Sequence, residues 1–249
     1  MYRYFIYFSY DGAAYHGWQV QPNAITVQQV LEEALATLVR QPVPLVGAGR
    51  TDAGVNAACM VAHADFPSEV DSRQLVYKLN KILPPDIAVS NIRRVRDDAH
   101  ARFDALSRCY NYRVVTAKSP FSRRYACRVS PDIDFAAMNI AAKALYEYSD
   151  FTSFSKLHTD VKTNNCKVTH AEWRRVGEHE WCFEIEADRF LRNMVRAIVG
   201  TLLLVGRGKM SIGEFRAVIE KKERGEAGDS AMGEALFLVD VKYPSEIFL

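Results

Sequence analysis

The chain has 249 residues, of which 49% are hydrophobic and 25% are charged. This balance is typical of a globular protein and excludes a disordered or collagen-like chain. The apolar runs are shorter than the roughly 18 residues of a membrane-spanning helix, and the first residues lack the pattern of a secretory signal. We therefore expect a cytoplasmic protein that neither spans nor binds a membrane.

The number and spacing of cysteines and histidines argue against disulfide bonds and metal sites. The five cysteines are odd in number, and no two of them have the CxxC spacing of a zinc knuckle. A disulfide framework is therefore disfavoured and a reducing compartment fits better. The six histidines form no HExxH pattern. We expect no metal ion.

Charge is distributed unevenly along the chain. Residues 93–128 contain ten basic and three acidic side chains and so carry +7; because the whole chain carries +2, the remaining residues carry −5. One strongly basic segment in a nearly neutral chain indicates a polyanion bound on one surface. A solvated surface segment is the alternative interpretation.

The hydrophobic pattern predicts two successive groups of elements, with period-two strands and helices that repeat every three or four residues. The first group comprises strand 4–10, helix 26–38, strands 43–48 and 57–66, helix 71–82 and strand 88–95. The second comprises strand 108–116, helix 134–145, strands 167–176 and 181–187, helices 190–205 and 211–222, and strand 236–241.

The order βαββαβ thus occurs twice, apart from one extra helix. It predicts an α+β fold of two ferredoxin-like halves with mainly antiparallel sheets. We place the boundary between Val95 and Ser107, with an N-terminal half at 1–100 and a C-terminal half at 101–249. A central cleft between the halves, lined by the basic segment, is the expected ligand site.

A glycine-rich stretch at residues 47–55 joins two predicted strands and carries Arg50 and Asp52. Glycine lets a ligand approach the backbone closely. The alternative is a turn in which Asp52 only hydrogen-bonds its own backbone. A dinucleotide-binding fingerprint is excluded, because position 52 is Asp rather than Gly and no helix follows.

Two further stretches mix aromatic and polar residues. Residues 10–19 suit either core packing or stacking on unpaired bases. Residues 100–113 interleave arginines with aromatics and suit either sheet packing or RNA contact. Along the strand, Tyr110 and Tyr112 share one face, and we expect one of them in the core and the other exposed at the cleft.

The apolar helix predicted at 190–205 carries two arginines near its start. Arg192 and Arg196 are four residues apart, which places them on one helical face. Because an unpaired buried charge is costly, each needs a partner, and a carboxylate such as Asp52 is suitable.

Together and in this order, these stretches resemble the TruA family of tRNA pseudouridine synthases. The most specific segment is 49–55, and residues 150–154 add to the resemblance. The resemblance implies an isomerase that converts uridine to pseudouridine at tRNA nucleotides 38, 39 and 40, in the anticodon stem-loop. It also implies a homodimer with tRNA lying across both subunits.

The resemblance also implies roles for four residues. Asp52 is the essential aspartate, and Tyr110 contacts the base. Arg50 occupies the space left by the flipped nucleotide, and Arg192 pairs with the aspartate. Because a neighbouring guanidinium favours an ionised carboxylate, we expect Asp52 to be charged at neutral pH. No cofactor is required, since the reaction has no net redox change.

The sequence departs from the family pattern in two places. Asn56 stands where the family usually has His, and residues 230–236 replace a Pro-Ala-x-Gly-Leu stretch.

Two other function classes compete with this interpretation. A non-catalytic RNA-binding protein of the RRM type would need a strand signature that is missing. A nucleoside hydrolase or glycosidase would need a second carboxylate near Asp52, for which Asp11 is the candidate.

Overall fold

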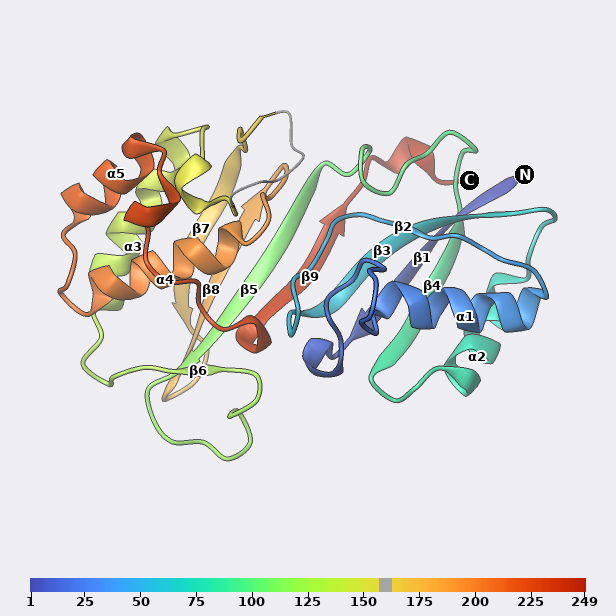
Figure 1. Cartoon of the computed structure of the whole chain (residues 1–249), viewed down its shortest axis with the longest axis horizontal. Coiled ribbons are helices and arrows are strands. Elements are labelled where there is room, and N and C mark those ends of the chain that lie inside the picture. The colour runs from blue at the N-terminus through green and yellow to red at the C-terminus, as the bar shows by residue number, and fades with distance from the viewer. Residues whose placement is uncertain (157–162) are drawn as a thin grey trace. The chain divides into compact units, whose positions relative to one another are not determined.

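The computed structural model describes residues 1–156 and 163–249. Over these residues the protein is a mixed α/β fold with nine strands, mostly antiparallel, and five α-helices (Figure 1). The chain forms two compact units. Unit 1 comprises Met1–Ser107 and Leu238–Leu249, and unit 2 comprises Arg108–Phe237. Within the described ranges, no helix is long and apolar enough to cross a membrane.

Unit 1 is built on strands in the order β4-β1-β3-β9, with the short β2 paired to β3. Strand β1 runs antiparallel to both β3 and β4. The elements are β1 (Tyr2–Tyr10), α1 (Val27–Val39), β2 (Val46–Gly47), β3 (Asn56–Phe66), α2 (Ser72–Ile82), β4 (Ile87–Arg94) and β9 (Leu236–Lys242).

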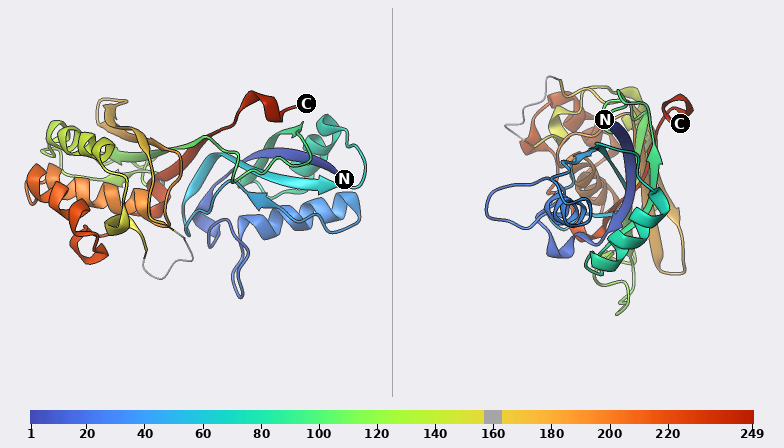
Figure 2. Two further views of the ribbon diagram at one scale, coloured as in Figure 1. Left: turned by 90° about the horizontal axis from the view of Figure 1, so that it is seen from above. Right: turned by 90° about the vertical axis from the view of Figure 1, so that its right-hand side faces the viewer.

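Local signals set the helices of unit 1. Thr26 precedes α1 and accepts a hydrogen bond from the Gln29 amide at 3.3 Å, as an N-cap residue does. Asp71 caps α2 in the same way at 3.0 Å. The apolar stripe of α1 is buried, and the helix lies along one side of β1 and β3 (Figure 2). Burial of that stripe contributes most of the stability of the helix.

Unit 2 has strands in the order β5-β8-β7, all antiparallel, and the short β6 pairs parallel to β5. Asp134 caps α3, and Ser211 with Glu214 forms a complete capping box at the start of α5. The elements are β5 (Ser107–Val115), β6 (Cys127–Arg128), α3 (Phe135–Lys143), β7 (Val168–Arg175), β8 (Glu180–Ala187), α4 (Met194–Gly206) and α5 (Ile212–Lys221).

Three elements differ from the sequence-based prediction. Helix α4 begins at Met194 rather than at 190, because Asn193 has a left-handed backbone with φ of 68°. Strand β2 is confined to Val46–Gly47 instead of 43–48, since Pro42 and Pro44 have no amide hydrogen to donate. Strand β6 was not predicted, because two residues carry no readable periodicity.

The compact units end at Ser107 and at Phe237, so most of β9 belongs to unit 1 rather than to the C-terminal half. Strand β9 is thus a late piece of the chain built into the first unit. The functional division into residues 1–100 and 101–249 stays a prediction.

Candidate active site

Asp52 lies in unit 1, in the connection between β2 and β3, of which residues 50–55 are hereafter the Asp52 loop. The Val55 amide donates to the Asp52 carbonyl at 3.2 Å, and Gly54 has a φ of +77°, which closes a tight turn after Asp52. The Asp52 side chain is half-buried and that of Arg50 is exposed. The turn therefore presents one carboxylate and one guanidinium two residues apart.

A second loop, residues 11–18 after β1, supports the Asp52 loop. The hydroxyls of Tyr10 and Thr51 share a hydrogen bond of 2.8 Å. The Trp18 amide donates to the Thr51 carbonyl at 3.3 Å, and the Gly54 amide donates to the Tyr15 carbonyl at 3.4 Å. The stretches 10–19 and 47–55, which lie far apart in the sequence, are thus joined by hydrogen bonds.

Two positions of this supporting loop require glycine, because the backbone there lies very close to the backbone of the Asp52 loop. A Cβ at Gly12 would collide with the Val55 carbonyl, and a Cβ at Gly17 would collide with the Thr51 carbonyl. Gly17 also has a φ of +85°, which side chains of other residues rarely allow. The sequence signals for this contact were the Asp11-Gly12 and His16-Gly17 pairs, which by themselves indicate only turns.

The aromatic side chains of the supporting loop are core residues. Tyr10, Tyr15 and Trp18 are only 4%, 6% and 2% exposed. The Tyr15 hydroxyl donates to Asp86 at 2.7 Å, and burial raises the pKa of Tyr15. Core packing therefore accounts for these three rings.

Asn56, one of the two departures from the family pattern, has a structural role. Its side chain is buried, and its Oδ1 accepts a hydrogen bond from the Gly12 amide at 2.8 Å. The residue at this position thus fixes the same close approach as the two glycines.

Asp11, the candidate second carboxylate of a hydrolase, is an N-cap residue. It precedes a short 3-10 helix at Gly12–Ala14, and its Oδ1 accepts a hydrogen bond from the Ala13 amide at 3.0 Å. This structural role gives the hydrolase alternative no support.

Tyr110 lies in unit 2 on β5, opposite Ile185 of β8. Its ring contacts that of Phe190 edge-on, with centroids 5.2 Å apart. Tyr110 is 8% exposed and Tyr112 is fully buried, so the expectation that one of them is exposed is wrong. Burial also raises the pKa of Tyr112. Both rings belong to the packed face of the strand.

Arg192 lies in the turn of residues 191–193 before α4, hereafter the Arg192 turn, and its side chain is exposed. The prediction that Arg192 and Arg196 share a helical face is wrong, because α4 begins only at Met194. Arg196 Nε donates to the Ala231 carbonyl at 2.7 Å, and Asn193 Nδ2 donates to Ser230 Oγ at 2.7 Å. The stretch 230–236, which differs from the family pattern, thus supports this turn and the start of α4.

The basic side chains of segment 93–128 differ in their burial and in their ion pairing. Arg94 pairs with Asp97 at 2.6 Å and Arg96 with Asp98 at 3.3 Å. Arg108 is buried and donates to the Asp188 carbonyl at 2.8 Å. Exposed basic side chains occur along the whole segment, at Arg93, Arg96, Arg102, Arg113, Lys118, Arg123, Arg124 and Arg128.

Asp52 and Arg50 belong to unit 1, and Tyr110 and Arg192 belong to unit 2. Their assembly into one site stays a prediction, as does the pairing of Arg192 with Asp52. Over residues 1–156 and 163–249, no group of three or more His, Cys, Asp or Glu side chains is arranged to hold a metal ion.

Comparison with known proteins adds the family. A family model described as tRNA pseudouridine synthase matches residues 6–104 and 141–244. The chain is 60% identical over 247 residues to "tRNA pseudouridine synthase A" of Bacteroides fragilis, covering 99% of this chain and 98% of the relative. It is 60% identical over 249 residues to the protein of that name from Parabacteroides distasonis, covering 100% and 98% of the two chains. It is also 41% identical over 239 residues to that of Bacillus subtilis, covering 94% and 96%. The chain therefore belongs to the tRNA pseudouridine synthase family of isomerases.

Proposed function

We propose that this chain isomerises uridine to pseudouridine at nucleotides 38, 39 and 40 of tRNA, in the anticodon stem-loop, with Asp52 as the essential carboxylate. The observation that carries the assignment of Asp52 is its place in a turn whose backbone is fixed by the loop 11–18. A carboxylate on a preorganised loop meets a reacting atom without reordering the chain.

The chemistry requires little beyond that carboxylate. The N1–C1′ bond of uridine breaks, the uracil turns, C5 joins C1′, and the proton from C5 is lost as N1 takes one up. Atoms and electrons balance within the nucleotide, so we propose that no cofactor takes part. Asp52 either attacks covalently or removes the C2′ proton, and both routes require its ionised form.

The other predicted residues take supporting roles in this proposal. Tyr110 stacks on the uracil with its hydroxyl near C5, and Arg50 fills the space left by the flipped nucleotide. Arg192 pairs with Asp52. Flipping costs a few kcal/mol, which the contacts in the pocket offset.

We further propose that the two halves are ferredoxin-like and flank a central basic cleft, and that the protein is a cytoplasmic homodimer across which tRNA lies. The strand orders within the units support the first part: β4-β1-β3 with β2 beside β3, and β5-β8-β7.

The decisive experiment removes the carboxylate alone. We expect Asp52→Asn to abolish pseudouridine formation, detected by pseudouridine-specific chemical labelling of tRNA, while tRNA affinity stays within about tenfold, or ~1.4 kcal/mol. Asp11→Asn is the matched control, because asparagine caps a helix as well as aspartate does. Pseudouridine formation by the Asp52→Asn protein would refute the assignment.

Tyr110 is tested by two substitutions. If its ring acts only as a platform, Tyr110→Phe should turn over nearly as fast as the wild type, whereas Tyr110→Leu should not. If its hydroxyl moves the C5 proton, Tyr110→Phe should bind tRNA yet fail in turnover. Normal turnover by both variants would remove Tyr110 from the site.

The exposed basic side chains of unit 2 are tested through the salt dependence of tRNA binding. Replacing Arg123 and Arg124 by Gln should weaken binding and flatten the plot of log affinity against log salt, by roughly 0.7–0.9 for each phosphate that the protein no longer neutralises. Replacing Lys221 and Lys222 is the control, since they already pair with Glu226 at 2.6 Å and Asp150 at 3.0 Å. A flatter slope for the lysine variant alone would contradict this RNA path.

A further inference from the structure

The segment of residues 99–104, which follows β4 in unit 1, displays an aromatic ring next to a guanidinium. Phe103 is 73% exposed, and the Arg102 side chain is also exposed. The Arg102 guanidinium lies 5.6 Å from the centre of the Phe103 ring. Together they offer a flat aromatic surface and a positive charge side by side.

The backbone around this pair is tightly organised. His100 Nδ1 accepts hydrogen bonds from the amides of Arg102 at 3.1 Å and Phe103 at 3.3 Å. Asp104 in turn accepts from the His100 amide at 2.7 Å. The imidazole of His100 also packs against the Phe103 ring, with centroids 4.2 Å apart. The backbone that carries the exposed ring is therefore held by its own hydrogen bonds, and the ring packs against His100.

The loop is also anchored to the core of unit 1. His63 of β3 is 6% exposed, and its Nδ1 accepts from the Ala101 amide at 3.1 Å. The Tyr243 hydroxyl donates to the Ala101 carbonyl at 2.6 Å. Burial lowers the pKa of His63 to about 4, so it is a neutral acceptor at neutral pH.

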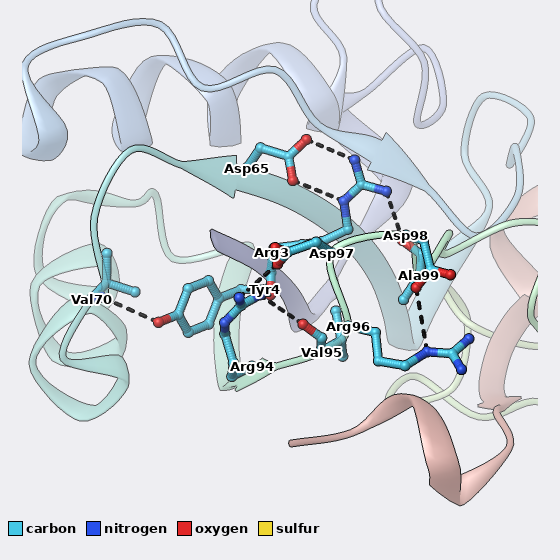
Figure 3. Close-up of polar contacts among 10 residues, drawn as sticks. All are labelled: Arg3, Tyr4, Asp65, Val70, Arg94, Val95, Arg96, Asp97, Asp98 and Ala99. Carbon is cyan, nitrogen blue, oxygen red and sulfur yellow. Dashed lines mark hydrogen bonds and ion pairs between the residues drawn. The ribbon is translucent and has the colours of Figure 1, made fainter. Parts of the chain in front are cut away.

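A second anchor holds the loop at Ala99, two residues before Ala101. Arg3 of β1 donates to the Ala99 carbonyl at 2.9 Å and forms a two-pronged pair with Asp65 of β3 at 2.8 and 2.7 Å (Figure 3). Figure 3 shows the Arg3 guanidinium between the carboxylate and the start of the loop. Two strands thus position the segment that carries Arg102 and Phe103.

We propose that Phe103 and Arg102 are a tRNA contact outside the uridine pocket, in which the ring stacks on an unpaired base and the guanidinium binds the adjoining phosphate. A π-face beside a fixed cation matches a nucleotide, which joins a flat base to an anionic group. Because the loop is already ordered, binding costs little conformational entropy. The inference rests on the proposed function, in which tRNA is the substrate.

A second copy of the chain suits this surface less well. Besides Phe103, the adjoining large apolar side chain that is exposed is Leu106, at 59%. Two such side chains offer far less area than the roughly 1,000 Å² of a stable protein interface. A nucleotide needs only the ring and the charge.

The test compares tRNA affinity among variants of the full-length protein, measured by fluorescence anisotropy with labelled tRNA. Phe103→Leu should weaken binding at least about fivefold, whereas Phe103→Trp should stay within about twofold of the wild type. Tyr77→Ala is the matched control: Tyr77 is an exposed ring, 64%, beside Lys81, but it lies on helix α2. Its affinity should not change.

Salt dependence separates the two contacts. Arg102→Gln should reduce the slope of log affinity against log salt by roughly 0.7–0.9, and Phe103→Leu should leave that slope unchanged. Since Phe103 is exposed, Phe103→Leu should also keep the wild-type melting temperature.

Four results would overturn the inference. For Phe103→Leu, these are a tRNA affinity equal to that of the wild type, a lowered melting temperature, or a smaller oligomer in sedimentation. For Arg102→Gln, it is an unchanged slope of log affinity against log salt. A wild-type protein that neither binds nor modifies tRNA would instead refute the proposed function. Normal binding and modification with no effect in the variants would refute this inference alone.

Discussion

The Asp52 loop and the Arg192 turn are held in place by different means. In unit 1, the Asp52 loop is fixed mainly by backbone groups, and it leaves no room for a Cβ at Gly12 or Gly17. In unit 2, the Arg192 turn also has backbone hydrogen bonds, from the Lys156 amide to the Arg192 carbonyl at 3.0 Å and from the Met194 amide to the Leu191 carbonyl at 3.1 Å. It adds a side-chain bond from Asn193 to Ser230 at 2.7 Å and involves no close approach that only glycine would allow. Where two backbones approach as closely as they do at Gly12 and Gly17, only glycine fits, whereas a side-chain contact can be replaced by another of similar reach.

The two departures that the family resemblance implies lie one beside each of these regions. The segment 49–55 matches the pattern throughout, and the one nearby departure, Asn56, still supplies a hydrogen-bond acceptor. The broad departure, at 230–236, falls in the segment whose side chains support the Arg192 turn.

The largest expected effect comes from the backbone contact. Gly17→Ala should destabilise the protein by about 3 kcal/mol or more, since it combines a left-handed backbone with a collision against Thr51. Gly49→Ala is the control, because a Cβ there meets nothing within 4 Å; its effect should stay within about 1 kcal/mol. Denaturant unfolding measures both, and equal effects would contradict the comparison.

Acid should weaken unit 1 through His63. The pKa of His63 falls from 6.5 to about 4 in the folded state, so only the unfolded chain takes up this proton between those values. The stability is fully present above pH 6.5 and is lost as the pH falls toward 4, by up to about 1.4 kcal/mol per pH unit. His63→Asn keeps an acceptor near the position of Nδ1 but does not titrate, so its unfolding free energy should depend less on pH. An unchanged pH dependence would show that the proton is bound elsewhere.

Asn56 tests whether the acceptor, rather than the residue type, supports the Asp52 loop. Asn56→Ala leaves the buried Gly12 amide without this acceptor and should cost about 1–3 kcal/mol. Asn56→His, the usual residue of the family, should recover most of that loss. Thermal unfolding measures the stability of both variants, and turnover shows whether the Asp52 loop still works. A histidine variant as unstable as the alanine variant would mean that the shape of the side chain matters more than its hydrogen bond.

The smallest effect is expected in the Arg192 turn. Ser230 Oγ accepts from Asn193 at 2.7 Å and from Arg224 at 3.0 Å, both only partly buried. Ser230→Ala should cost roughly 1 kcal/mol, because water can replace a half-buried acceptor. A destabilisation as large as that of Gly17→Ala, measured in the same denaturant series, would remove the distinction between the two regions.

Sequence reasoning succeeded where the signal is local. The starts of four helices could be predicted, because each N-cap side chain accepts a hydrogen bond from a backbone amide of its own first turn. These N-cap residues are Thr26, Asp71, Asp134 and Ser211. It failed where distant segments decide the outcome. The contact between the loops at 11–18 and 50–55 joins residues some forty apart, and periodicity carries no information about it. The start of α4 likewise depends on the left-handed Asn193 and its contact with Ser230.

The return of residues 238–249 to unit 1 has a consequence for synthesis on the ribosome. Lys242 accepts from the Leu106 amide at 2.8 Å, Ile247 accepts from the Arg96 amide at 2.9 Å, and Phe248 packs against Phe5. When its first 107 residues have emerged, unit 1 therefore still lacks these contacts, even though domains usually fold in the order of their synthesis. Its nascent strands wait for the whole of unit 2 to be translated, and during that interval they are an expected target for chaperones that shield unpaired strand edges.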